Sequence, residues 1–226
     1  MRFKKFGYNR AELLISGRVG DMVFRIDVWV ASFAHAANVK CGGALTPLLG
    51  ALSAAGNGGL IFIAVSLIML AFKGTRKAGC AALIALAASV LFTEVLLKNI
   101  VGRPRPFADD SSVFYTYWVE AGSLPAGGYS FPSGHTAAAM AFAAAMFFCF
   151  RKDLSWLFFL VPAAMGFSRV YFQVHYFTDV AAAFAVGFLC ELAALYALRL
   201  LLRLAFFSKF PEGDGLRQPF RRRKGD

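Results

Sequence analysis

The sequence predicts an all-α protein whose transmembrane helices form one polytopic bundle. Hydrophobic residues make up 58% of the 226 positions, and 25 positions are Phe, whereas soluble domains are about 45–50% apolar. Five stretches are nearly free of charge, and each approaches or exceeds the length of about 20 residues that a helix needs to cross a bilayer. The chain length suits a single domain, so we expect one bundle rather than several independent units.

The five stretches are predicted to be membrane-spanning helices. Their interiors consist mainly of Ala, Leu, Phe and Gly, and small residues allow helices to pack closely in lipid. Long helices in a soluble core are the alternative, but five such runs in one short chain argue against them. The predicted spans cover residues 58–72, 78–97, 134–150, 154–172 and 180–207, of which the first and third are short.

The N-terminal part, residues 1–56, is more polar than the rest and predicts another arrangement. Residues 22–37 carry Asp27 and other polar groups among apolar ones, a pattern typical of an amphipathic helix at the membrane interface. The apolar run that follows is broken by Pro47 and by glycines. We therefore expect N-terminal interfacial or re-entrant helices packed on a membrane core of residues 57–207, with a sixth span as the alternative.

Lys and Arg gather in two expected connections and in the tail, residues 208–226. Short loops rich in these residues stay in the cytoplasm, which predicts a multi-pass inner-membrane protein whose disordered tail is also cytoplasmic. This bias and attraction to anionic lipid headgroups account for the net charge of +11. No aromatic platform interleaves the basic residues, so we expect a lipid bilayer as partner and no nucleic acid. The basic connections contain Lys73, Arg76, Lys77, Arg151 and Lys152.

Cysteine and histidine give no sign of a bound metal or cofactor. The four Cys are isolated, without metal-type or redox-type spacing, and the three His lack a cluster of carboxylates. We therefore expect neither a metal centre nor any other cofactor.

Three short polar strings interrupt the apolar sequence where predicted spans begin or end. Together they supply three fixed cations, two imidazoles and one carboxylate. Successive spans alternate in direction, so all three strings should meet on one side of the membrane, opposite the basic connections. The strings are Lys98 with Arg105-Pro106, then Pro132-Ser133-Gly134-His135, then Ser168-Arg169 followed by His175 and Asp179.

Two of these strings predict specific chemistry. Ser133 and Gly134 stand at a helix start, where unpaired N–H groups and the positive end of the dipole favour an anion. Ser133 could cap this helix or donate to the anion. His175 and Asp179 are four residues apart and could share a helical face. A carboxylate on one imidazole nitrogen fixes the tautomer and leaves the other nitrogen free as a nucleophile.

Taken together, the strings resemble the tripartite signature of the type 2 phosphatidic acid phosphatase superfamily. The resemblance covers residues 98–179, keeps the three motifs in order and keeps the spacing within each. It implies a metal-independent phosphatase that passes through a phosphohistidine. His175 would attack phosphorus, Asp179 would orient it, and His135 would protonate the departing oxygen. The phosphate oxygens would be held by Lys98, Arg105, Ser133, Gly134 and Arg169.

Two charged residues beside these motifs have open roles. Arg103 could contact a second phosphate or lipid headgroups, and headgroups are the favoured interpretation. Glu94 lies four residues before Lys98 on the same helical face, so the two should pair. The pair could neutralise Lys98 until substrate arrives, or Glu94 could order the site by also binding Arg105. Residues 107–131 are rich in aromatic and acidic side chains and could form a lid or a plain interfacial loop.

The resemblance also narrows the class of substrate to a membrane lipid phosphate. A site at the outer boundary of the membrane suits an amphiphile whose phosphate sits at headgroup level. Small bacterial-looking members of the family often recycle the carrier lipid of cell-wall synthesis, so undecaprenyl diphosphate is the expected substrate. Phosphatidylglycerol phosphate, phosphatidic acid, a glycolipid phosphate, or transfer of phosphate to an alcohol remain alternatives. The sequence favours no oligomeric state.

Overall fold

The computed structural model describes residues 18–203, and within them every element of regular secondary structure is helical. Residues 204–207 of the fifth predicted span and the predicted tail, 208–226, lie outside this range. The longer helices are α2 (Arg18–Lys40), α3 (Leu45–Ala55), α4 (Leu60–Ala71), α5 (Arg76–Val90), α8 (Gly134–Cys149), α10 (Leu160–Tyr171) and α11 (Phe177–Arg203). The shorter ones are η1 (Asn57–Gly59), the π-helix η2 (Leu91–Leu97), α6 (Lys98–Val101), η3 (Pro106–Ala108), α7 (Val113–Glu120), α9 (Lys152–Ser155) and η4 (Trp156–Phe159).

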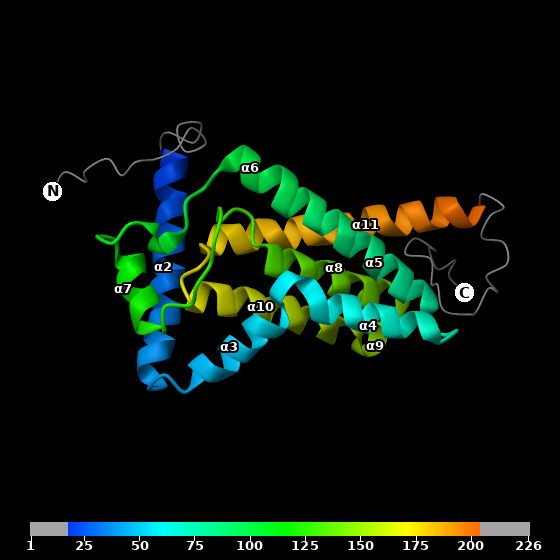
Figure 1. The fold of residues 1–226 in the computed structure, drawn as a ribbon, viewed down its shortest axis with the longest axis horizontal. Helices are drawn as coiled ribbons and strands as arrows, with labels where there is room; N and C mark the ends of the chain where they lie inside the picture. The colour runs from blue at the N-terminus through cyan, green and yellow to red at the C-terminus, as the bar shows by residue number, and fades with distance from the viewer. Residues whose placement is uncertain (1–17, 204–226) are drawn as a thin grey trace, which may run out of the picture.

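Helices α4, α5, α8, α10 and α11 lie side by side in a bundle, and α8 is its central member (Figure 1). Helix α8 packs against α5, α10 and α11, and the residues from Thr136 to Met146 are all buried. Most of them are Ala, which lets the neighbouring helices approach closely. At Gly187 on α11 an added Cβ would overlap the carbonyl oxygen of Ala137, so this crossing requires glycine.

The number of membrane spans differs from the prediction. Three helical segments of residues 18–203 are long and apolar enough to cross a membrane: Arg76–Ala108, Asp153–Tyr171 and Phe177–Leu201. A fourth is present if α3 and α4, bent by 46° at their junction, form one broken span rather than a re-entrant loop. The predicted count of five is therefore not confirmed. Two of the predicted spans do not meet the length requirement alone, because α4 has 12 residues and meets α3 at a break, and α8 has 16 residues.

Helix α2 crosses one end of the bundle and contacts α7, α10 and α11 (Figure 1). Asn38 connects these elements, since its amide donates to the carbonyl of Glu120 and its oxygen accepts the Tyr171 hydroxyl at 2.7 Å. On the other side of α2, Trp29 is 71% exposed. The N-terminal helix is thus fixed to the end of the bundle where the loops of the polar strings lie.

Candidate active site

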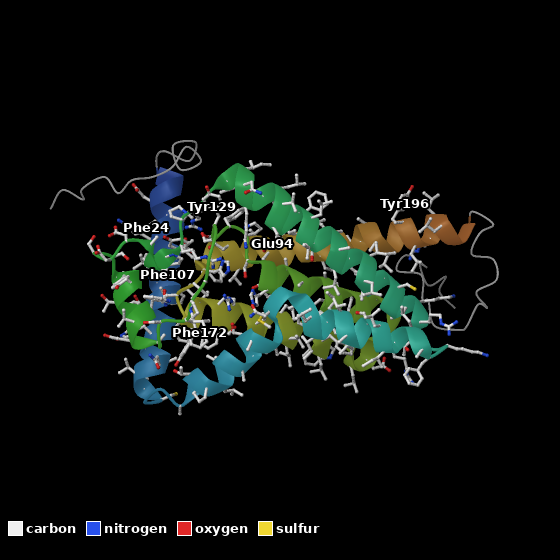
Figure 2. All side chains as sticks on the ribbon, in the orientation of Figure 1. Phe24, Glu94, Phe107, Tyr129, Phe172 and Tyr196 are labelled. Atoms are coloured by element: carbon white, nitrogen blue, oxygen red, sulfur yellow. The ribbon has the colours of Figure 1, made fainter. Side chains whose placement is uncertain are left out.

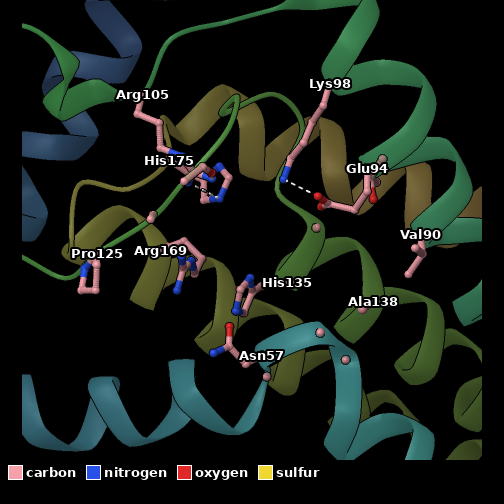
Figure 3. A pocket seen from close by; sticks show the side chains of 17 residues that line it. Asn57, Val90, Glu94, Lys98, Arg105, Pro125, His135, Ala138, Arg169 and His175 are labelled. Carbon is pink, nitrogen blue, oxygen red and sulfur yellow. Dashed lines mark hydrogen bonds and ion pairs between the residues drawn. The ribbon is translucent and has the colours of Figure 1, made fainter.

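A pocket of about 440 Å³ lies at this end of the bundle, enclosed by the polar strings. Most of the predicted site residues line it, although they are up to 81 residues apart in the sequence, as Glu94 and His175 are. Figure 3 shows their side chains converging from α6, α8, α10 and the adjoining loops. Ser133 and Asp179 lie behind the pocket wall. The predicted residues that line the pocket are Glu94, Lys98, Arg105, Gly134, His135, Arg169 and His175.

His175 is held as a neutral imidazole with one unprotonated nitrogen. Its Nδ1 lies 2.7 Å from the carbonyl oxygen of Ser130, which can only accept a hydrogen bond, so Nδ1 carries the proton. Its Nε2 lies 3.3 Å from Nη1 of Arg105, which can only donate, so Nε2 keeps its lone pair. Burial lowers the pKa of His175 from 6.5 to about 4. At neutral pH the lone pair at Nε2 is therefore available for attack.

Asp179 stands behind His175 but is not its hydrogen-bond partner. Its Oδ2 lies 3.6 Å from Nδ1 of His175, beyond hydrogen-bonding distance, and instead accepts the main-chain N–H of Tyr176 at 2.9 Å. The spacing of four residues correctly predicted that the two side chains lie close together. The hydrogen bond of Nδ1, however, goes to the carbonyl oxygen of Ser130. No side-chain pattern marks a main-chain carbonyl, so the sequence carried no signal for it.

Two of the three pocket cations keep an uncompensated charge. Arg105 donates to the carbonyl oxygens of Gly127, Gly128 and Val174 as well as to His175. Arg169 donates to the hydroxyl of Ser53, and its buried Nε has no hydrogen-bond partner within residues 18–203. Their partners are neutral, so both guanidinium groups are fixed without losing their attraction for an anion.

The start of α8 forms another wall of the pocket. Ser133 is fully buried and caps the helix by accepting the N–H of Thr136, so of the two predicted roles the structure shows the cap. Gly134 lets other groups approach the helix end, because an added Cβ would overlap Oε1 of Glu94. One residue further, Nε2 of His135 is buried and has no hydrogen-bond partner among the described residues.

Glu94 occupies the part of the pocket between Lys98 and the start of α8. Its Oε2 accepts a hydrogen bond from Nζ of Lys98 at 2.7 Å, so the ion pair predicted for these residues is present (Figure 3). Figure 2 places Glu94 toward the α2 end of the bundle, far from Tyr196 on α11. Within residues 18–203 the hydrogen bonds of Arg105 go to Gly127, Gly128, Val174 and His175 and not to Glu94, so the geometry favours the neutralising role over the ordering one.

Arg103 does not line the pocket, and two carboxylates hold its side chain. Its guanidinium donates to Oδ1 of Asp179 at 2.6 Å and to Oδ2 of Asp27 at 2.9 Å. Only 15% of its side chain is exposed. The structure thus shows two buried carboxylates as its partners, where the sequence interpretation favoured lipid headgroups.

Sequence reasoning also missed the fourth side of the pocket. The break between α3 and α4, Gly56–Gly59, lines it, and Gly58 and Gly59 have positive φ. Figure 3 shows Asn57 pointing toward His135 from this break. The Asn-Gly-Gly sequence was a turn signal, but nothing in it indicated which site the turn faces. Residues 125–127 of the expected lid region line the pocket as well.

The donor set favours an anionic ligand over a metal ion. Within residues 18–203 no three His, Cys, Asp or Glu side chains are grouped as metal ligands. Three cations and a helix start surround the pocket instead, and these are the groups that bind and stabilise phosphoryl oxygens.

The structure thus combines a helical bundle that contains candidate membrane spans with a pocket lined by three cations and two imidazoles. The chain belongs to the PAP2 superfamily, a family of lipid phosphatases, because the family model matches residues 78–202. It is 31% identical over 128 residues to a Sulfolobus acidocaldarius protein named undecaprenyl-diphosphatase. That match covers 56% of this chain and 58% of the relative, so the chain spans little more than half of the relative's length.

Two solved structures share the fold. The Bacillus subtilis structure described as a transmembrane PAP2-type phosphatidylglycerolphosphate phosphatase has a TM-score of 0.63 and 20% identity, covering 84% of this chain and 92% of that one. Aquifex aeolicus LpxE has a TM-score of 0.58 and 22% identity, covering 67% of this chain and 86% of that one. Family membership and these neighbours confirm the resemblance inferred from the three motifs.

Proposed function

We propose that this protein hydrolyses a phosphate ester or diphosphate of a membrane lipid through a phosphohistidine at His175, without a metal ion. The observation that carries the proposal is the arrangement around Nε2 of His175. Its unprotonated Nε2, which accepts a 3.3 Å hydrogen bond from Arg105, lies in a pocket lined by Lys98, Arg105 and Arg169. A neutral nucleophile held among cations suits a phosphate anion, whose oxygens the cations would bind.

In the first step Nε2 attacks phosphorus, and the bond from phosphorus to the lipid oxygen breaks as the P–N bond forms. His135 donates its proton to the departing oxygen, which leaves as the lipid alcohol or, from a diphosphate, as the lipid monophosphate. The ring of His175 becomes positively charged, and its Nδ1–H remains bound to the Ser130 carbonyl. The carboxylate of Asp179, 3.6 Å away, stabilises that charge.

In the second step water attacks the phosphohistidine. His135, now neutral, accepts a proton from the water, the P–N bond breaks, and its electron pair returns to Nε2 of His175. Inorganic phosphate leaves, and both imidazoles have regained their starting protonation states. Throughout, Arg105 and Arg169 hold the phosphoryl oxygens in fixed positions, and such preorganised charge is the main source of catalysis in phosphoryl transfer.

The preferred substrate in this proposal is undecaprenyl diphosphate. The relative that is 31% identical bears the name of that activity, and the family acts on lipid phosphates. Phosphatidylglycerol phosphate, phosphatidic acid and glycolipid phosphates are the alternative substrates, and transfer to an alcohol acceptor is the alternative reaction. Basic connections on the opposite side would place the site on the extracytoplasmic face.

The test is phosphate release by the purified protein from a panel of lipid phosphates and diphosphates, with and without a metal chelator. We expect phosphate release to persist with the chelator. Rapid alkaline quenching should trap labelled phosphohistidine on the protein, and acid treatment should remove that label because the P–N bond is labile in acid. His175→Ala should abolish both release and label. Transfer to added alcohol that exceeds phosphate release would favour the phosphotransferase alternative. Undiminished turnover by His175→Ala would overturn the proposed mechanism.

A further inference from the structure

We propose that Asp27 and Arg103 form a positioning pair for this reaction, in which helix α2 fixes the charge and orientation of Asp179 behind the nucleophile. The inference rests on the proposed function, and it assigns a role to a carboxylate that lies 152 residues before Asp179 in the chain. Neither Asp27 nor Arg103 lines the pocket, so both act through Asp179 and not on the substrate.

Asp27 is saturated with hydrogen bonds from two elements. Its side chain is fully buried, and Oδ2 accepts from Nη2 of Arg103 and from the hydroxyl of Thr178, each at 2.9 Å. Oδ1 accepts the main-chain N–H of Thr178, also at 2.9 Å. Thr178 lies in the first turn of α11, whose exposed N–H groups favour a carboxylate. Asp27 therefore joins α2 to the helix that carries Asp179.

Arg103 is fixed on three sides. Nη1 donates to Asp179 at 2.6 Å and to the Thr178 hydroxyl at 2.8 Å, while Nη2 donates to Asp27. The guanidinium also lies 3.7 Å from the ring centroid of Tyr176, which packs edge-on against Phe114 of α7. Such a planar group held by a ring and two carboxylates has little freedom, so Oδ1 of Asp179 is held in place.

The charges of Asp27, Arg103 and Asp179 explain why a second carboxylate would support the reaction. One guanidinium compensates Asp27 and Asp179 together, so a net negative charge remains behind His175. Without Asp27, Arg103 would compensate Asp179 alone, and the cation that forms on His175 would lose stabilisation. Without Arg103, the negative charge would grow and Oδ1 of Asp179 would lose its partner. Removal of either residue should thus slow turnover, but with opposite electrostatic effects on His175.

The charges that face His175 directly remain the same in both variants. The comparison therefore isolates the pair. The charged and titratable groups that face His175 directly are Asp179 on α11, Arg105 in the loop after α6, Arg169 on α10 and His135 on α8.

The experiment compares Asp27→Asn and Arg103→Gln with wild type in detergent micelles, measuring kcat, KM and the acid limb of the kcat/KM profile. Asp21→Asn is the matched control, since it removes a carboxylate from the same helix at an exposed position. We expect kcat to fall about tenfold in both test variants, as a small misplacement of the site would cause, with KM within about twofold of wild type. The acid limb should shift by about half a pH unit, downward in Asp27→Asn and upward in Arg103→Gln, and stay in place in the control.

Equal kcat in Asp27→Asn and Asp21→Asn, or shifts of the acid limb in the same direction, would overturn the pairing. If Asp27→Asn does not fold, Arg103→Lys supplies the test, because Lys keeps the charge but cannot bridge two carboxylates. Its kcat should fall while the acid limb stays in place, and wild-type kcat in that variant overturns the proposal. Lack of phosphate release by the wild-type protein would instead overturn the proposed function itself.

Discussion

Two groups of buried charges lie at the same end of the bundle, and they are balanced differently. In the pocket, Arg105 and Arg169 bind carbonyl and hydroxyl oxygens, so their positive charge stays available. Behind the pocket wall, Arg103 lies between Asp27 and Asp179, and its charge is more than compensated. The difference shows that a charge left without an opposite partner marks the place for a charged ligand, while a compensated group serves to hold the structure.

The sharpest test of this comparison removes the nucleophile that lies between the two groups. His175→Ala should reduce phosphate release by at least about 10³-fold, because no other pocket group offers a free imidazole nitrogen in the same place. His35→Ala is the matched control, since His35 stacks on Tyr117 of α7 away from the pocket. Comparable loss in both variants, measured as initial rates with melting temperatures, would contradict the assignment.

The next largest effect is expected at the uncompensated cations. Arg169→Gln removes a buried guanidinium whose Nε has no hydrogen-bond partner within residues 18–203. We expect kcat/KM to fall by about 10²–10³-fold, as for the loss of one preorganised charge in other sites. Arg151→Gln is the control, because Arg151 is exposed and pairs with Asp153. A loss of under about threefold at Arg169 would mean that its charge is not used for the phosphate.

Glu94 should give a smaller effect with a distinct signature. In Glu94→Gln the side chain keeps its shape but no longer neutralises Lys98, with which it forms an ion pair of 2.7 Å. Inorganic phosphate should therefore inhibit at about tenfold lower concentration, and turnover should fall because the product leaves more slowly. Phosphate inhibition constants measure the effect, and a thermal melt checks that the fold is intact. Unchanged inhibition and turnover would retire the role of Glu94.

Lowering the pH from 7 to 5 should have the smallest effect, because it should leave the protonation state of His175 unchanged. Burial lowers the pKa of His175 to about 4, so the ring stays neutral from pH 7 to pH 5 and gains its proton only as the pH falls through about 4. The protein has only 3 His, so NMR of labelled imidazoles can follow this one, with His175→Ala for its assignment. A titration near the ordinary value of 6.5 would contradict the buried, neutral state.

The pH profile of kcat provides a related check on the two imidazoles. His175 must be neutral to attack, and His135 must be protonated to donate. Burial and the neighbouring cations lower the pKa of His135 to about 3, and a bound phosphate anion offsets those cations and raises that pKa again. A bell-shaped profile is therefore expected for kcat, which reports the substrate complex. A profile that stays flat across the range in which imidazoles titrate would count against these roles.

Sequence reasoning identified the charged and imidazole residues of the pocket, but neither its fourth side nor all of the contacts of those residues. Motif order and spacing named Lys98, Arg105, His135, Arg169 and His175, and the structure brings all of them to one cavity. The spacing of four residues explained why Asp179 lies near His175, yet the closer partner is a main-chain carbonyl. Such a partner has no side-chain identity, so a pattern of residue types cannot reveal it.

The number of membrane spans is also difficult to predict from the sequence, because it depends on contacts that residue types do not show. Hydropathy detects apolar stretches, but it does not distinguish a helix that crosses a membrane from a shorter helix enclosed by others. Helix α8 is apolar and has 16 residues, and most of it contacts other helices. Its composition is that of a span, while its surroundings are those of a protein core.

The sequence by itself determined the helical class, the family and the charged and imidazole side chains of the pocket, because these depend on composition and on local spacing. Only the tertiary structure decided that Asp27 on α2 reaches Arg103, that the break between α3 and α4 closes the pocket, and which nitrogen of His175 is free. Each of these depends on contacts between segments far apart in the chain. Their distance is set by helix packing, which no local pattern encodes.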